Sequence, residues 1–173
     1  MRTQSPRDLA RLSALLERAG VMLALDEGVL RATTPVSGWS ALQHLFHLLL
    51  ADELSLKNAT SLVRGRGRLL TERGELDPRA RAFLERGRLP QGAAAPRIVV
   101  PPPHPDLSLV RAIHADAVAA LSAPELAGAL PDGPLGIPHQ ALGVLGAGEW
   151  LRFARMHSAH HLRIARAVLG ARG

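Results

Sequence analysis

A connection of about forty residues, rich in Pro and Gly, separates two pairs of helical segments in this chain. It begins at Gly65, includes the run PPPHP, and holds one short helical candidate at Asp77 to Arg86. A link of that length can return along a full helix, whereas antiparallel neighbours need only a few residues. The second and third long helices are therefore predicted to run parallel.

Capping signals predict four long helices: about Pro6 to Val29, Ser40 to about Arg64, Asp106 to about Ala123, and one that begins near Glu149. Ser5 is the expected N-cap of the first helix, with Asp8 in the capping-box position. Ser40 and Gln43 form the corresponding pair in the second helix, which Gly65 can end.

These helices predict an all-α fold, a four-helix bundle in which a long crossover joins helices two and three, in the order up-down-down-up. At 173 residues the chain is interpreted as a single domain, residues 1–173, long enough to bury a core. The absence of cysteine excludes a disulfide framework, a thiolate zinc site and a cysteine nucleophile. The one strand-like pattern is the short run RIVV, from Arg97 to Val100.

The net charge of +6 raises the question of a nucleic-acid partner. Two tryptophans and three phenylalanines give no platform on which bases could stack, and the most basic stretch, Arg64 to Arg88, also carries acidic residues. Nucleic-acid binding is therefore the least favoured hypothesis. Because neither a signal peptide nor a run long enough to span a membrane is apparent, we expect a cytoplasmic protein without a membrane partner.

The last helical segment carries three of the eight histidines within five positions: His157, His160 and His161. At about 100 degrees per residue, Trp150 and Val168 fall within about 20 degrees of His157, and His161 falls within about 40. His157 and His161 thus lie on the apolar stripe, and His160 lies on its flank. A shared metal ion would satisfy one ring nitrogen of His157 and one of His161. The alternative is that both are core histidines whose ring nitrogens bond to the backbone or to water.

The second helical segment offers a further histidine on an apolar face. His47 shares this face with the polar residues Gln43 and Asn58, and His44 lies at its edge. Gln43 and Asn58 are candidates to orient a ligand or to bind a cofactor or substrate, or else they satisfy each other or a water.

The opposite side of the second helical segment also carries an apolar stripe: Leu42, Leu45, Leu49 and Leu56. A helix that is apolar on two faces must be covered on both. One face would meet the bundle, and the other needs the crossover segment or a second subunit, so a homodimer is preferred.

These histidines stand in a familiar order. Trp39 and Ser40, His47 eight positions after the Trp, and the motif H-x-x-H-H that starts at His157 resemble the DinB/YfiT-like superfamily. The segment PHQALGVLGAGEW, from Pro138 to Trp150, also resembles the approach to the last helix in that group. The resemblance covers the second helix and everything from about Pro138 onward.

The resemblance implies a four-helix bundle with a long crossover and a divalent metal, nickel or zinc, held by His47, His157 and His161. Three protein ligands leave a position open for water or substrate. The lone histidines His114 and His139 are expected to be structural and stay outside the ligand set.

Two more histidines are candidates for roles beside the metal. His160 and His44 could each act as an acid or base next to the ligands, or simply form a hydrogen bond at the helix edge, and the edge interpretation is favoured for both.

By resemblance, the chemistry would be metal-dependent hydrolysis, or transfer of a low-molecular-weight thiol to a small electrophilic substrate, in a bacterial protein. Because the chain has no cysteine, the thiol would come from a soluble cofactor such as bacillithiol. Gly146 departs from the family pattern, which leads us to expect a capping Ser before Glu149. The alternative hypothesis is a non-catalytic dimeric bundle whose histidines are core residues or bind metal adventitiously.

Overall fold

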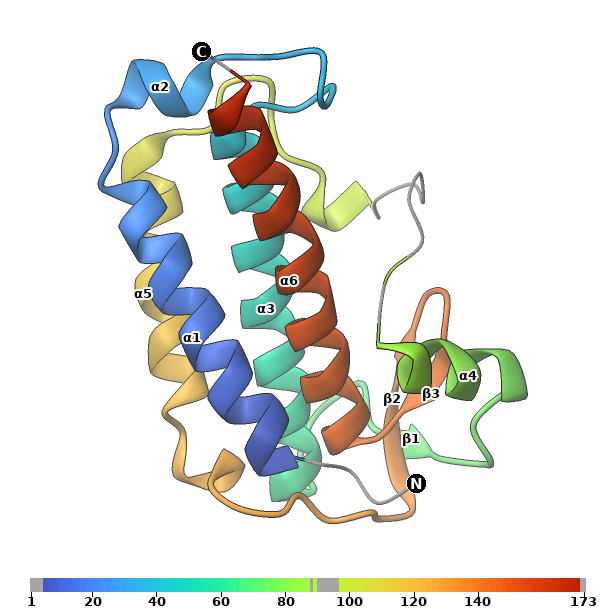
Figure 1. Ribbon diagram of the computed structural model, residues 1–173. Helices are drawn as coiled ribbons and strands as arrows, with labels where there is room; N and C mark the ends of the chain where they lie inside the picture. Colours follow the sequence, from blue (N-terminus) through green and yellow to red (C-terminus); the bar gives the residue numbers. More distant parts are fainter. Residues whose placement is uncertain (1–4, 88, 90–96, 172–173) are drawn as a thin grey trace.

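The computed structural model describes residues 5–87, 89 and 97–171. Four long helices form a bundle: α1 (Ser5–Leu23), α3 (Ala41–Arg64), α5 (Leu107–Leu121) and α6 (Ala147–Gly170) (Figure 1). In the described part of the chain the helices carry most of the core, and the predicted all-α bundle is confirmed.

The direction of the helices agrees with the length of their connections. α1 and α6 run one way along the bundle, and α3 and α5 run the other way (Figure 1). α3 packs on α5 and α6, and α1 packs on the same two helices from the other side. The predicted parallel pair is thus α3 and α5, and the order is up-down-down-up.

Short elements fill the connections. They are the helices α2 (Glu27–Arg31) and α4 (Pro78–Arg86), the 3₁₀ turns η1 (Arg97–Val99) and η2 (Pro124–Leu126), and the strands β1 (Thr71–Glu72), β2 (Leu135–His139) and β3 (Gly143–Leu145). The three strands form an antiparallel sheet in the order β1-β2-β3, with Thr71 opposite Gly136 and Ile137 opposite Leu145. The crossover therefore reaches η1 and then α5 only after it has contributed one strand to this sheet.

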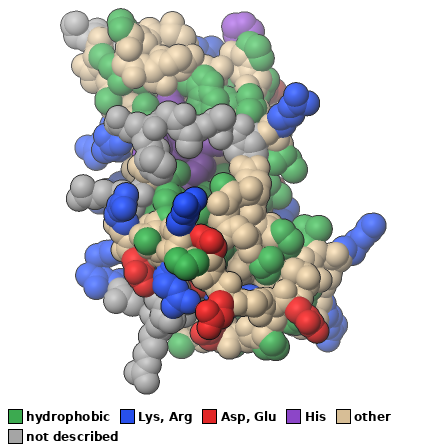
Figure 2. Space-filling view, turned by 90° about the vertical axis from the view of Figure 1, so that its right-hand side faces the viewer, with side chains coloured by type: hydrophobic (Ala, Val, Ile, Leu, Met, Phe, Trp, Pro, Cys, Tyr) green, Lys and Arg blue, Asp and Glu red, His purple; other side chains and the backbone are tan. Residues whose placement is uncertain are grey.

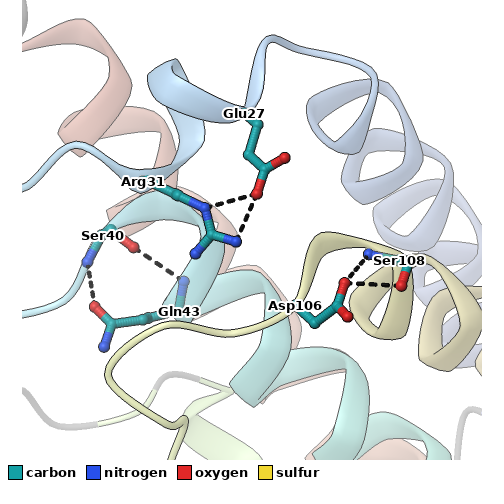
Figure 3. A network of polar contacts seen from close by, with 6 residues as sticks. All are labelled: Glu27, Arg31, Ser40, Gln43, Asp106 and Ser108. Carbon is teal, nitrogen blue, oxygen red and sulfur yellow. Dashed lines mark hydrogen bonds and ion pairs between the residues drawn. The ribbon is translucent and has the colours of Figure 1, made fainter.

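The helix α3 begins and ends where its capping residues predict. The Ser40 hydroxyl accepts a hydrogen bond from the Gln43 amide at 3.3 Å, and the Gln43 side chain accepts one from the Ser40 amide at 2.9 Å (Figure 3). Gly65 ends the helix with a φ of 62°, in the left-handed region that favours glycine. These caps fix the rotation of the helix that carries His44 and His47.

Two predicted boundaries were wrong. α1 ends at Leu23 instead of near Val29, because Asp26 starts the separate helix α2 by accepting a hydrogen bond from the Val29 amide. Ser5 was predicted as the N-cap that precedes the first helix. In the structure it is a buried residue within α1.

The predicted strand pattern was also misplaced. RIVV forms the 3₁₀ turn η1, while the strands β2 and β3 lie in the second Pro- and Gly-rich loop. Each of these strands is only three to five residues long and the hairpin contains Pro138 and Gly143, which weakens the alternation that marks a strand.

The second leucine stripe of α3 is covered by this same chain. Its four leucines are 0% exposed: Leu42, Leu45, Leu49 and Leu56. α3 lies between α5 and α6, so both apolar faces are satisfied within one subunit. The sequence argument for a homodimer therefore falls away. Among the described residues, every helix is too short or too polar to cross a membrane.

Candidate metal centre

Three histidines from two antiparallel helices converge inside the bundle. His47 comes from α3, and His157 and His161 come from successive turns of α6; one ligand atom from each lies within 4.8 Å of the other two. The ring centroids are 4.7 Å apart for His47 and His157, 4.4 Å for His47 and His161, and 4.5 Å for His157 and His161. The three residues predicted to meet therefore do meet.

Burial keeps these imidazoles neutral. His47 and His157 are 2% and 6% exposed, and His161 is partly buried. Removal from water lowers the pKa of all three rings, and the neighbouring histidines lower the pKa of His157 and His161 further. A neutral imidazole has one nitrogen lone pair available, which is the form that binds a metal ion.

A backbone carbonyl sets the tautomer of His47. Its Nδ1 lies 2.8 Å from the carbonyl oxygen of Val99 in η1, and because a carbonyl only accepts, Nδ1 carries the proton and donates. The Nε2 atom is then unprotonated and lies 3.0 Å from Nε2 of His157. This is the arrangement of a metal-binding histidine, in which the second nitrogen is held by a fixed acceptor.

The donor set fits a divalent transition metal. Two nitrogens bound to one tetrahedral metal at about 2.0–2.1 Å are separated by about 3.3 Å. The 3.0 Å between the Nε2 atoms of His47 and His157 is close to this value. Three imidazoles without thiolate or carboxylate suit zinc, nickel or copper better than magnesium or calcium.

His157 differs from His47 in its second nitrogen. Its Nδ1 is buried and has no hydrogen-bond partner among the described residues. Phe153 stacks on the ring, with centroids 5.5 Å apart and planes inclined by 30°. On its Nδ1 side, packing against Phe153 and no hydrogen bond within the described chain therefore orients this ring.

His44 lies behind the triad. Its Nδ1 is 3.1 Å from Nδ1 of His161, and its Nε2 is 2.9 Å from the hydroxyl of Ser37. Burial lowers its pKa to about 4, with a smaller contribution from His47 and His160. Both ring nitrogens thus lie within hydrogen-bond distance of protein groups.

His160 lies beside the triad, with its ring centroid 5.0 Å from that of His161. It is partly exposed, and burial together with Arg163 lowers its pKa. Histidine side chains are visible among hydrophobic ones in the upper half of the face drawn in Figure 2. Both His160 and His161 are only partly buried.

The two polar candidates on the His47 face are Gln43, which caps α3, and Asn58, which lies far from the triad along α3. The Gln43 amide caps α3 and donates to the carbonyl of Pro102 at 3.2 Å, so backbone groups engage both of its ends. Asn58 follows His47 by three helical turns, about 16 Å along the axis at 1.5 Å per residue. Neither residue is included in the candidate metal centre.

The two remaining predicted structural histidines, His114 and His139, are held by backbone hydrogen bonds and packing outside the triad. His114 donates from Nε2 to the Leu16 carbonyl at 2.9 Å and holds α5 against α1. His139 accepts a hydrogen bond from the Ala141 amide and packs against Trp150 and Phe153, and burial lowers its pKa to about 4.

Three contacts of the triad and of His44 were not predicted from sequence. Trp39 lies against the triad, with its ring centroid 5.2 Å from that of His47. Val99 supplies a carbonyl to His47 from η1, and Ser37 supplies a hydroxyl to His44 from the segment before α3. Backbone carbonyls carry no sequence signal, and a single loop serine forms no periodic pattern.

Fold and site together define a class: an all-α bundle with a buried histidine triad that can hold a metal ion. Residues 3–167 match the family described as "Protein of unknown function (DUF1569)", and the chain belongs to that family. No curated protein and no solved structure matches it.

Proposed function

We propose that this chain is a metal-binding protein of the DinB/YfiT-like kind, in which His47, His157 and His161 hold one divalent cation, nickel or zinc. The observation that carries the proposal is the convergence of three neutral imidazoles within 4.8 Å. The order of the histidine motifs along the chain and the up-down-down-up topology support the same assignment.

The proposed activity is hydrolysis of a small electrophile, or transfer of a soluble thiol such as bacillithiol to it. A bound divalent metal with an open coordination position supplies Lewis-acid activation of water or of a thiol. The chain itself positions the three ligands and places the Trp39 ring against His47 and His161, which shields that side from water. A role for His160 as acid or base stays a prediction.

A second candidate is a bundle without a resident metal. The 3.0 Å contact between His47 and His157 and the 3.1 Å contact between His44 and His161 are also compatible with two histidine–histidine hydrogen bonds. Such pairing would satisfy four buried ring nitrogens without a cation. This interpretation predicts substoichiometric, adventitious metal.

Elemental analysis of protein purified without a histidine tag separates the two candidates. We expect about one zinc or nickel per chain in the parent, and an anomalous X-ray signal between α3 and α6. Each of His47→Ala, His157→Ala and His161→Ala should lose the stoichiometric metal.

His114→Ala is the matched control, because it removes a partly buried histidine whose contact is with α1. This variant should keep the metal. Retention of metal by two of the three triad variants would contradict the proposal.

A further inference from the structure

A partly buried chain of hydrogen bonds leads from the triad to the segment before α3. His44 is 3% exposed, and its two ring nitrogens face His161 on one side and Ser37 on the other, at 3.1 and 2.9 Å. The Ser37 hydroxyl also accepts a hydrogen bond from the backbone amide of Trp39 at 3.1 Å. The position of Ser37 is therefore fixed by the start of the same helix that carries His44.

The direction of the hydrogen bonds in this chain follows from what a ligand must offer. Nδ1 of His161 faces His44, which leaves Nε2 to bind a metal. A free lone pair on Nε2 requires that Nδ1 carries the proton and donates to Nδ1 of His44. His44 must then carry its own proton on Nε2 and donate to Ser37.

Each acceptor that this arrangement requires is present. The Ser37 oxygen has two lone pairs, one for the amide of Trp39 and one for His44. If the chain of hydrogen bonds ran the other way, His161 would carry its proton on Nε2 and could not bind a metal there. The orientation of this relay therefore decides whether the third ligand is available.

We propose that Ser37 and His44 form a positioning relay that holds His161 in the tautomer whose Nε2 binds the metal. The inference rests on the proposed function and extends it to two residues outside the ligand set. His44 acts through His161, as the Val99 carbonyl acts through His47. His157 has no such partner among the described residues, so the relay would orient the second of the three ligands.

Metal affinity of His44 variants tests the relay. In chelator competition with zinc, His44→Leu should bind about 10–100-fold more weakly than the parent, because it fills the space but accepts no hydrogen bond. His44→Asn, whose amide oxygen can accept near the place of Nδ1, should recover most of this loss. His114→Leu, a matched loss of a histidine that bonds to α1, should bind zinc as the parent does.

A zinc affinity of His44→Leu within twofold of the parent would overturn the inference, as would equal weakening in the Leu and Asn variants. Ser37→Ala removes only the acceptor of His44 and should weaken zinc binding several-fold. It keeps the relay testable should His44→Leu not fold.

The tautomer can be measured without metal. Nitrogen-15 NMR of the histidine rings in the metal-free parent should show His161 protonated on Nδ1, and His44→Leu should lose this preference. A parent that binds no zinc but shows this tautomer would refute the proposed function and keep the relay. Protonation of His161 on Nε2 in the metal-free parent would refute the relay, whatever the metal content.

Discussion

Among single residues, the contact made by the second ring nitrogen separates the roles of the buried histidines. His47 has a carbonyl, His161 has another imidazole, and His157 has no polar partner in the described chain. His114 and His139 use a ring nitrogen for a backbone group outside the triad. Position on a helix face therefore predicted which rings gather, but the partner of each nitrogen determines what each ring can do.

The buried histidines predict a pH dependence of stability. Burial lowers the pKa of His139 from 6.5 to about 4, so the ring stays neutral in the folded state while the unfolded chain takes up a proton. The unfolded state binds more protons in this window, and the contribution of His139 to the free energy of unfolding falls as the pH drops from about 6.5 towards 4.

Urea unfolding of the metal-free parent and of His139→Phe across this pH range measures that contribution. The variant should show a smaller loss of stability on acidification, because it removes one partly buried ring that stays neutral in the folded state. The informative quantity is the difference in the free energy of unfolding between the two proteins. Burial raises the pKa of Asp52, and this group contributes to the pH dependence with the opposite sign in both proteins. Parallel pH profiles for parent and variant would contradict the assignment.

Between elements, a buried ion pair attaches the first helix to the last. Asp8 of α1 contacts Arg155 at 2.9 Å and Arg152 at 3.4 Å, and Arg152 also donates to the Leu84 carbonyl in α4. Desolvation lowers the pKa of Arg155, and Asp8 opposes this shift. The carboxylate predicted to cap α1 thus links α1 to α6, and Arg152 links α6 to α4.

Removal of this carboxylate should destabilise the bundle. Asp8→Ala leaves two largely buried guanidinium groups without their acidic partner, so we expect a loss of roughly 2–4 kcal/mol in the free energy of unfolding. Glu27→Gln, which breaks the exposed pair with Arg31 within α2, should cost less than about 0.5 kcal/mol. Equal denaturation midpoints for the two variants would show that Asp8 contributes no more than a surface pair.

At the scale of the whole molecule, the candidate centre lies at the contact between α3 and α6. One of these helices precedes the long crossover and the other follows it. A cation held by His47 together with His157 and His161 would bind the folded chain only, because the unfolded chain does not bring these residues together. Binding of the metal and stability of the bundle are therefore linked.

Thermal unfolding with and without metal tests this linkage. Zinc at about 100 times its dissociation constant should stabilise the parent by about 2.7 kcal/mol, seen as a higher midpoint. His47→Ala should show no such increase, while His114→Ala should show it on a lower baseline. An equal increase in His47→Ala would place the zinc at another site.

Much of the fold was predictable because its signals are local. Caps lie within four residues of the helix ends that they define, so Ser40, Gln43 and Gly65 predicted α3 correctly. Helical periodicity placed His157 and His161 on one face of α6 and His47 on a face of α3. The crossover topology followed from the length of the middle connection.

The features that sequence did not predict depend on contacts between segments that are distant in sequence. The carbonyl that sets the tautomer of His47 lies 52 residues away, and His44 and His161 are 117 residues apart. At Gly146, where a Ser was expected, a Cβ would lie 2.6 Å from the guanidinium of Arg73, so a Ser there would require that side chain, which pairs with Glu149, to shift.

Sequence alone determined where the four long helices form and which of their faces are apolar, because hydrogen bonds and periodicity act over a few residues. Only the tertiary structure decided that α5 and α6 cover both faces of α3 and which group each buried imidazole contacts, because packing brings together side chains that no local rule relates.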